Sequence, residues 1–265
     1  MKELQEILKL MPLSIQEFYD RLADEYHLIF GNWDEAVKWQ GEVLDTLLRS
    51  ETGRGSLSIL DCSCGIGTQA IGLALLGHRL TATDLSPRSI ERAREEAERF
   101  GVEITFGTAD FCTLEEAVEG TFEAVISFDN ALPHMMSRDD LLCAARSIRS
   151  KVREGGLFMA SIRDYDELLK ERPGATTPKV IDTPEGRRVY FQVWDWDEDG
   201  RAYVFNFFLL SEEGEGWQTV LHDARYRAVL RDELRDVLKE AGFSDIGWNT
   251  PAESGYFQPI VAARV

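Results

Sequence analysis

The sequence is short of basic residues: 29 lysines and arginines stand against 47 acidic residues, which gives a formal net charge of −18. A field of this sign repels nucleic acids and anionic membranes, so neither is an expected partner. The sequence also lacks any run of about 18 apolar residues, and we therefore expect no membrane span. Residues 1–8 carry acids and no apolar signal core, which predicts a cytoplasmic location.

Cysteine and histidine are scarce too, with four residues of each. The cysteines, Cys62, Cys64, Cys112 and Cys143, have no second pair or histidine cluster at the spacing of a zinc site, so we expect no metal centre. Disulfides are rare in the cytosol, and the sequence therefore predicts reduced, buried thiols at these positions.

From residue 57 onward the chain alternates between strand and helix patterns. The pattern predicts strands at 57–61, 80–84, 103–106, 122–128 and 156–161, and helices at 68–77, 87–100, 113–118 and 139–151. It resumes near the end with a helix at 231–241 and strands at 243–248 and 257–264. Such alternation is typical of an α/β fold with a mostly parallel sheet and helices on both faces.

Two segments depart from this alternation. Residues 14–50 have helical patterns, whereas 176–226 contain two long strands, at 187–196 and 201–210, joined by an Asp-Gly turn. We therefore expect an N-terminal helical cap over 1–52, a Rossmann-like domain over 53–170 and 227–265, and an inserted antiparallel β lobe over 171–226. The lobe would form a substrate pocket or an oligomer contact.

The expected strands end in loops that suit a ligand. The first is followed by Gly65 and Gly67 in a Gly-x-Gly-x-x-Ala loop, and glycines let a backbone approach a ligand closely. Asp84 ends the next strand, about 20 residues further on, where an acid suits a ribose diol. Asp110-Phe111 and Phe128-Asp129-Asn130 follow the next two strands. Because these loops share one sheet edge, they predict a site for an adenosine-containing cofactor.

Asp61 bears on which cofactor this is, because it comes directly before the glycine loop. A carboxylate there would lie poorly beside the pyrophosphate of a nicotinamide dinucleotide. It would lie well beside the cationic amino-acid end of S-adenosylmethionine, while Asp110 could accept a hydrogen bond from the adenine amino group. The sequence favours S-adenosylmethionine, and a nicotinamide-dependent oxidoreductase stays as an alternative.

These motifs resemble those of the class I S-adenosylmethionine-dependent methyltransferases, within them the glycine N-methyltransferase and glycine/sarcosine methyltransferase group. The resemblance rests on three segments: Asp61-x-x-Cys64-Gly65-x-Gly67, Asn130-Ala-Leu-Pro-His134 and Arg163-Asp164-Tyr165-Asp166. It implies a Rossmann-like, mostly parallel seven-stranded sheet. Ser63 departs from the broader motif, which has glycine at that position.

The resemblance also implies roles for individual positions. The methionine end of the cofactor would be held by Asp61, Cys64, Gly65 and Gly67. The ribose would be bound by Asp84, and the adenine by Leu85, Asp110 and Phe111. Further cofactor contacts are expected from Phe128 and, in a lid formed by the N-terminal helices, from Tyr26 and Trp33.

Asn130 and His134 would line the methyl-transfer site, and His134 is the candidate for a base or for orienting the nucleophile. In glycine methyltransferases the arginine of the third segment grips the substrate carboxylate, and Arg163 stands there. A salt bridge to its own segment is the alternative. The other expected substrate contacts are Tyr165, Trp194 and Tyr226.

The predicted function is methyl transfer from S-adenosylmethionine to a small molecule by direct displacement, leaving S-adenosylhomocysteine. The expected acceptor atom is an amine nitrogen. C-methylation of an electron-rich aromatic such as an indole, or O-methylation, stays open, as do a cofactor-binding regulatory module without turnover and a homo-oligomer. A nucleic-acid acceptor is disfavoured, because the Asp/Asn-Pro-Pro-Tyr/Phe motif that holds a flipped base is absent.

Overall fold

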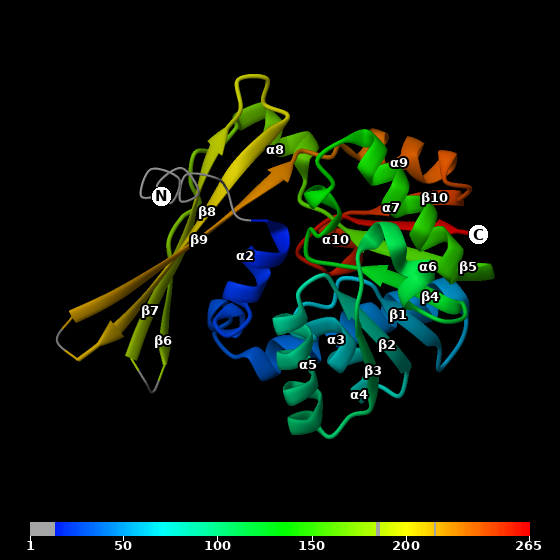
Figure 1. Cartoon of the computed structure of the whole chain (residues 1–265), viewed down its shortest axis with the longest axis horizontal. Coiled ribbons are helices and arrows are strands. Elements are labelled where there is room, and N and C mark those ends of the chain that lie inside the picture. Colours follow the sequence, from blue (N-terminus) through cyan, green and yellow to red (C-terminus); the bar gives the residue numbers. More distant parts are fainter. Residues whose placement is uncertain (1–13, 184–185, 215) are drawn as a thin grey trace, which may run out of the picture.

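The computed structural model describes residues 14–183, 186–214 and 216–265. The first residues of the predicted cap, including 1–8, on which the expectation about a signal peptide rests, lie outside these ranges. Figure 1 shows a seven-stranded sheet with its helices, a separate four-stranded sheet, and a short helix, α2 (Ile15–Leu22), between the two. None of the described helices is long and apolar enough to cross a membrane.

The seven-stranded sheet has the strand order β10-β11-β5-β4-β1-β2-β3. β11 runs antiparallel to both of its neighbours, and the other pairs are parallel. This arrangement confirms the predicted α/β fold with a mostly parallel sheet. The bounds are β1 (Ser58–Asp61), β2 (Arg79–Asp84), β3 (Ile104–Thr108), β4 (Phe122–Ser127), β5 (Val152–Ser161), β10 (Ser244–Asn249) and β11 (Ile260–Arg264).

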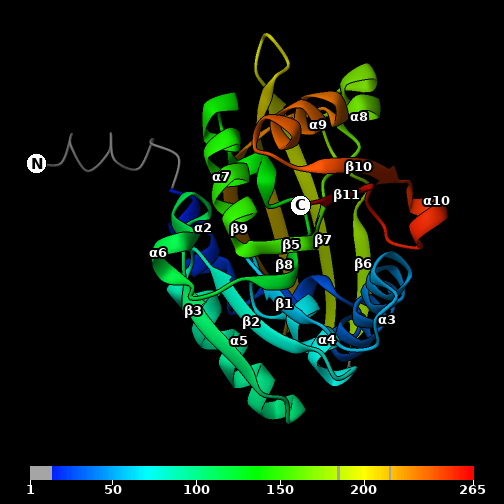
Figure 2. The same cartoon turned by 90° about the vertical axis from the view of Figure 1, so that its right-hand side faces the viewer.

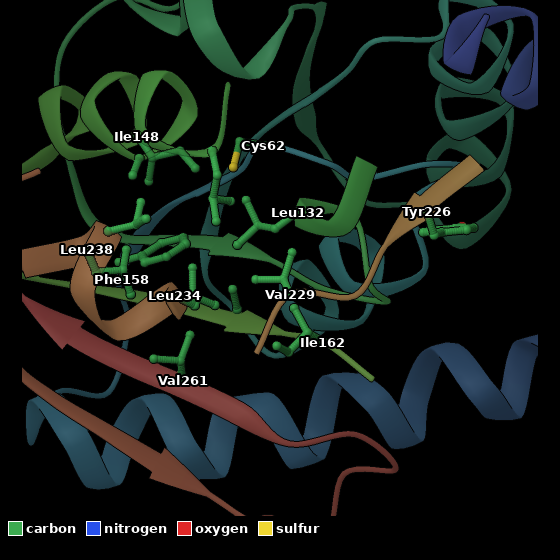
Figure 3. Packing of buried hydrophobic residues seen from close by; sticks show 14 of the residues in the cluster. Cys62, Leu132, Ile148, Phe158, Ile162, Tyr226, Val229, Leu234, Leu238 and Val261 are labelled. Atoms are coloured by element: carbon green, nitrogen blue, oxygen red, sulfur yellow. The ribbon is translucent and has the colours of Figure 1, made fainter. Parts of the chain in front are cut away.

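Helices cover both faces of this sheet, as expected (Figures 1 and 2). One face is packed by α3 (Trp33–Thr52), α4 (Thr68–Leu75) and α5 (Pro87–Phe100). The other is packed by α6 (Leu114–Ala117), α7 (Arg138–Lys151) and α9 (Arg231–Glu240). Figure 3 shows Ile148, Leu234 and Leu238 over Phe158 and Val261 on this second face. Shorter helices are η1 (Tyr26–Ile29), η2 (Phe111–Thr113), η3 (Leu132–His134), α8 (Tyr165–Glu171) and α10 (Pro251–Ser254).

Helices α3 and α4 cross with their backbones in contact, because each carries a glycine at the crossing. A Cβ atom added to Gly41 would lie 2.5 Å from the carbonyl carbon of Gly72. Contacts this short are repulsive, so no larger residue fits without moving a helix. The close crossing fixes α4, whose N-terminus follows the glycine loop.

The four-stranded antiparallel sheet has the order β6-β7-β8-β9, with bounds β6 (Lys179–Thr183), β7 (Gly186–Trp196), β8 (Ala202–Glu213) and β9 (Gly216–Arg227). The two central strands correspond to the pair predicted from the sequence. Along β8, alternate residues point inward and are buried: Tyr203, Phe205, Phe207 and Leu209. These side chains belong to the same apolar cluster as the second face of the large sheet, so the two sheets share one core.

The N-terminal segment is not one continuous helix, because residues 23–32 form turns and η1 between α2 and α3. Helix α2 is held on both sides. Asp20 accepts a hydrogen bond from the Ser86 hydroxyl at the start of α5, at 2.6 Å. Just beyond α2, Glu25 lies 2.8 Å from His222 of β9. α2 therefore bridges the two sheets above the glycine loop (Figure 1).

Candidate active site

A cavity lies at the carboxyl edge of β1, β2, β3 and β4, beneath α2. Its lining combines residues from α2 and η1 with the loops that follow the strands. The predicted site residues that line it are Tyr26, Cys64, Gly65, Asp84, Leu85, Asp110, Phe111, Phe128 and His134. The structure thus brings together side chains from four successive strand ends, as the sequence predicts.

The glycine loop is shaped by its own turn and by Asp84. Gly67 has a φ of 96° and is the N-terminal cap of α4, and a Cβ atom there would lie 2.9 Å from Ile71. Gly67 therefore shapes the turn and does not line the cavity. The backbone N–H of Gly65, which does line it, donates to Asp84 Oδ2 at 2.8 Å.

Asp84 is buried and faces the cavity with both carboxylate oxygens hydrogen-bonded. Oδ2 accepts from Gly65, and Oδ1 accepts from the backbone N–H of Ser86 at 2.9 Å. A carboxylate has about four lone-pair sites, so each oxygen can accept one more hydrogen bond. The group is thus fixed in orientation and able to bind a pair of vicinal hydroxyls.

Asp61 has an unsatisfied oxygen next to the loop. The residue is 1% exposed; Oδ1 accepts from the backbone of Ser63, and Oδ2 has no protein partner. Burial, together with the negative charges of Asp84 and Asp129, raises the pKa of the Asp61 carboxyl to about 8. Asp61 itself does not line the cavity, but the residues that follow it, Cys62 and Ser63, do. A buried carboxyl among other carboxyls is stabilised by a nearby cation, so this wall of the cavity fits a positively charged ligand group.

The far side of the cavity is suited to a planar base. Leu85 and Phe111 provide apolar surfaces there. Asp110 is exposed, and its Oδ1 accepts from the backbone N–H of Cys112 at 2.7 Å, which leaves the other oxygen available. These are the residues predicted to bind the adenine, and that role stays a prediction.

At the α2 side, Tyr19, His134 and Tyr226 form a hydrogen-bonded group. The Tyr19 hydroxyl lies 2.9 Å from His134 Nε2 and 3.3 Å from the Tyr226 hydroxyl. The imidazole packs on the Tyr226 ring, with 4.1 Å between centroids. Tyr19 was not predicted as a site residue, and its partners lie more than a hundred positions away in the chain. No local pattern distinguishes it from a core aromatic residue.

His134 is held as a neutral acceptor. Its Nδ1 lies 3.3 Å from the carbonyl oxygen of Arg225, which can only accept, so Nδ1 carries the hydrogen. Nε2 then accepts from the Tyr19 hydroxyl. Burial lowers the pKa of His134 to about 3. These contacts favour an orienting role over that of a base.

The loop after β4 turns two neighbouring side chains in different directions. Asp129 and Asn130 both have left-handed backbone angles, with φ of 59° and 70°. Asp129 lines the cavity, where its carboxylate accepts from Gln69 and Tyr256. Asn130 does not line it: its amide bonds Tyr165 and the backbone of Arg163. The predicted catalytic residue Asn130 is therefore a positioning residue in this structure.

Arg163 lies behind the His134–Tyr226 pair. It donates to the Tyr203 hydroxyl at 2.7 Å and faces the rings of Trp194 and Tyr226 at 4.9 and 5.3 Å. The alternative salt bridge within its own segment is not formed, because Asp164 and Asp166 pair with Arg231. Among the described residues no carboxylate makes an ion pair with Arg163. Arg163 is not one of the residues that line the cavity, so its positive charge lies behind the cavity wall without a carboxylate partner in the described part of the chain.

Three other predicted residues do not reach the cavity. Tyr165 is fully buried and hydrogen-bonds Asn130 and Tyr203. Trp194 packs beside Arg163 and donates to Gln192 at 3.1 Å. Trp33, predicted in the lid, packs on Phe100 instead, because the first residue of α3 faces α5 and not the loops. Trp33 thus does not line the cavity, and the cofactor contact predicted for it is not supported by this geometry.

The match to known proteins agrees with this geometry. Residues 59–156 match a family described as the methyltransferase domain. Together with the sheet order and the site at the strand ends, the match shows that the chain has the fold of the class I S-adenosylmethionine-dependent methyltransferases. The resemblance found in the motifs is thereby confirmed.

Individual relatives make the similarity more specific. The chain is 28% identical to glycine/sarcosine N-methyltransferase of Parasynechococcus marenigrum over 163 residues, which cover 60% of this chain and 57% of that protein. It is 24% identical to glycine/sarcosine N-methyltransferase of Aphanothece halophytica over 242 residues, 89% of this chain and 85% of that protein. The structure of CalS10, an amino pentose methyltransferase from Micromonospora echinaspora, gives a TM-score of 0.73 at 15% identity, covering 86% and 92% of the two chains.

Proposed function

We propose that the cavity binds S-adenosylmethionine and that the protein transfers its methyl group to a small molecule. The observation that carries this proposal is the buried carboxyl of Asp61, which has an unsatisfied oxygen and two further carboxyls near it. S-adenosylmethionine brings a cationic amino-acid end to this corner, a ribose diol to Asp84 and an adenine to Asp110. A dinucleotide would place a pyrophosphate beside Asp61 instead, and like charges would repel.

The protein's part in the reaction is alignment and exclusion of water. S-adenosylmethionine, when bound, supplies a methyl group that is already activated. Tyr19 and Tyr26 cover the cavity from the α2 side, which keeps solvent from the reacting atoms. The neutral His134 orients the Tyr19 hydroxyl, which can hold an acceptor in line with the methyl group.

The acceptor atom in this proposal is an amine nitrogen. The glycine/sarcosine N-methyltransferases that the chain resembles methylate nitrogen, as their names state, and the structural neighbour CalS10 is named as acting on an amino sugar. Since His134 is unsuited to remove a proton, the amine would react in its neutral form. Arg163, with no anionic partner of its own, would bind a carboxylate or another anionic group of the acceptor.

Three further expectations belong to this proposal. The net charge of −18 supports a small acceptor over a nucleic acid. A cytoplasmic location is part of the proposal, supported by the four cysteines, none of which is paired in the structure. The exposed edge strand β6 offers a surface for assembly into a homo-oligomer.

The proposal is tested by calorimetric titration of S-adenosylmethionine into the purified protein, followed by turnover assays with a panel of amines and amino acids. Asp84→Ala should weaken binding by about 1–3 kcal/mol, because the ribose hydroxyls lose a fixed acceptor. Binding of reduced nicotinamide dinucleotide in place of S-adenosylmethionine would overturn the proposal. Tight binding without methylation of any acceptor would instead favour a regulatory module.

The acceptor class is tested with Arg163→Met, which keeps the length of the side chain and removes its charge. The KM of carboxylate-bearing amines should rise about tenfold or more, because one charge-assisted hydrogen bond is lost. The KM of amines without a carboxylate should change little. An equal effect on both groups of acceptors would contradict the role of Arg163.

A further inference from the structure

Two of the cysteines lie together on the surface, outside the cavity described above. Cys112 is in η2 and Cys143 is in α7, and these two elements pack against each other. The Cys112 sulfur lies 3.8 Å from the carbonyl oxygen of Asp140, three residues before Cys143 in α7. Both cysteines line the same small surface cavity. The two thiols therefore lie on one surface patch, although they are distant in the sequence.

Both thiols can be reached from solvent. Cys143 is exposed and Cys112 is partly exposed, and both line a second, open surface cavity. The expectation of four buried thiols is thus wrong for this pair and holds for Cys62 and Cys64. Arg146 lines the same cavity one turn beyond Cys143, together with Glu115 and Asp139. Among the described residues no group of three or more metal-binding side chains forms, so the pair is not part of a metal site.

We propose that Cys112 and Cys143 form a reversible disulfide when the protein meets hydrogen peroxide. The Cys143 thiolate attacks one peroxide oxygen, the O–O bond breaks, and a sulfenic acid forms as hydroxide leaves. The Cys112 sulfur then attacks the sulfenic sulfur, and its S–H proton leaves with the hydroxyl group as water. In total, two thiols and one peroxide give one disulfide and two waters. The protein is oxidised and the peroxide is reduced.

The order of these steps follows from the surroundings of each thiol. Burial raises the pKa of the Cys112 thiol to about 12, which disfavours the reactive thiolate at Cys112. Cys143 is the more exposed of the two, so peroxide reaches it first and Cys112 completes the disulfide.

A disulfide here would act on the adenine side of the cofactor cavity. The backbone N–H of Cys112 donates to Asp110 Oδ1, and Phe111 lies between these residues. Asp110 and Phe111 both line the cavity. Linking η2 covalently to α7 fixes this segment against the helix, and we expect the adenine contacts to weaken. This consequence rests on the proposed function, whereas the formation of the disulfide does not.

The disulfide is tested on the full chain with an equimolar dose of hydrogen peroxide. Intact mass should fall by two hydrogen atoms, peptide mapping should find Cys112 joined to Cys143, and dithiothreitol should reverse the change. Cys143→Ser and Cys112→Ser are matched variants that should show no such loss. A disulfide-linked dimer, or a sulfinic acid on Cys143 with Cys112 still free, would overturn the proposal.

The link to the cavity is tested by measuring the affinity of S-adenosylhomocysteine before and after oxidation. The Kd should rise roughly threefold or more in the oxidised protein and return on reduction, while peroxide leaves Cys143→Ser unaffected. An unchanged Kd in protein with a mapped disulfide would overturn the link. Absence of binding to the reduced protein would instead count against the proposed function.

Discussion

At the scale of single residues, the ionisable side chains that lack an ion-pair partner are the strongest indication of which ligand groups the site would bind. Asp61 has a buried carboxylate oxygen with no protein partner. Arg163 has aromatic and hydroxyl neighbours but no carboxylate among the described residues. Burying an unpaired charge costs several kcal/mol or more unless a ligand or a proton compensates it. In the proposed function, a positively charged group of the cofactor would replace the proton on Asp61, and a negatively charged group of the acceptor would pair with Arg163.

The first prediction concerns the proton on Asp61. Because its pKa is raised to about 8, the carboxyl is mostly protonated at neutral pH in the ligand-free protein. A cation beside Oδ2 lowers that pKa, so binding should release the proton. Calorimetry in two buffers of different ionisation enthalpy should show more proton release from the wild type than from Asp61→Asn, whose affinity is also weaker. Equal release from both proteins would contradict a cation at Asp61.

The second prediction concerns the Tyr19 hydroxyl. Tyr19→Phe removes the group that donates to His134 and touches the Tyr226 hydroxyl. We expect kcat to fall roughly tenfold, equivalent to about 1.4 kcal/mol of transition-state stabilisation, with little change in cofactor affinity. Single-turnover rates and calorimetry separate the two quantities.

A matched control for this variant is Tyr190→Phe. Tyr190 packs on Phe207 in the four-stranded sheet and does not line the cavity. The kcat of Tyr190→Phe should therefore stay at the wild-type value. If Tyr19→Phe lowered affinity and left kcat unchanged, Tyr19 would be a binding residue only.

At the scale of secondary-structure elements, the close crossing of α3 and α4 fixes the glycine loop. The third prediction is that Gly72→Ala lowers the free energy of unfolding by about 2 kcal/mol or more, because the new methyl group meets the backbone of α3. Gly174→Ala is the matched control: nothing lies within 4 Å of its added Cβ, so its effect should stay within about 0.5 kcal/mol. Denaturant titrations compare the two, and equal stability would contradict the close packing.

The same scale shows why the sequence predicts the cofactor side better than the acceptor side. Asp61 and Asp84 each end a buried strand, and parallel strands bring their ends to one edge whatever the rest of the fold does. Tyr19 and Tyr226 meet only because α2 is bridged between α5 and β9. Such a contact depends on how whole elements pack together, and local sequence patterns do not predict that packing.

Backbone conformation explains two other differences. Asn130 follows the expected strand, as predicted, but its left-handed angles turn its amide toward Tyr165. Trp33 is expected in a lid formed by the N-terminal helices, but the cap at Asn32 starts α3 with the indole packed on Phe100. In both cases the sequence predicts the position along the chain but not the direction of the side chain, which a few dihedral angles set.

At the scale of the whole molecule, the net charge and the buried carboxyls both lower the stability of the folded protein as pH rises. The net charge of −18 makes the surface repel itself more as carboxylates ionise. Inside, burial raises the pKa of the carboxyls of Asp61, Asp84 and Asp129. A carboxyl with a raised pKa binds its proton more tightly in the folded state than in the unfolded state. It therefore favours folding at low pH and loses that contribution as pH rises.

The fourth prediction follows from this sign. For Asp61, stabilisation should decline from the unfolded pKa of about 4 up to the folded value of about 8. The melting temperature of the ligand-free protein should thus fall between about pH 5 and about pH 8.5, and fall less in Asp61→Asn. Salt screens the surface charges and not the buried carboxyl, so the difference between the two proteins should persist at high ionic strength. If salt removed that difference, surface repulsion alone would account for the decline. S-adenosylmethionine supplies the missing cation, and it should raise the melting temperature most at the alkaline end.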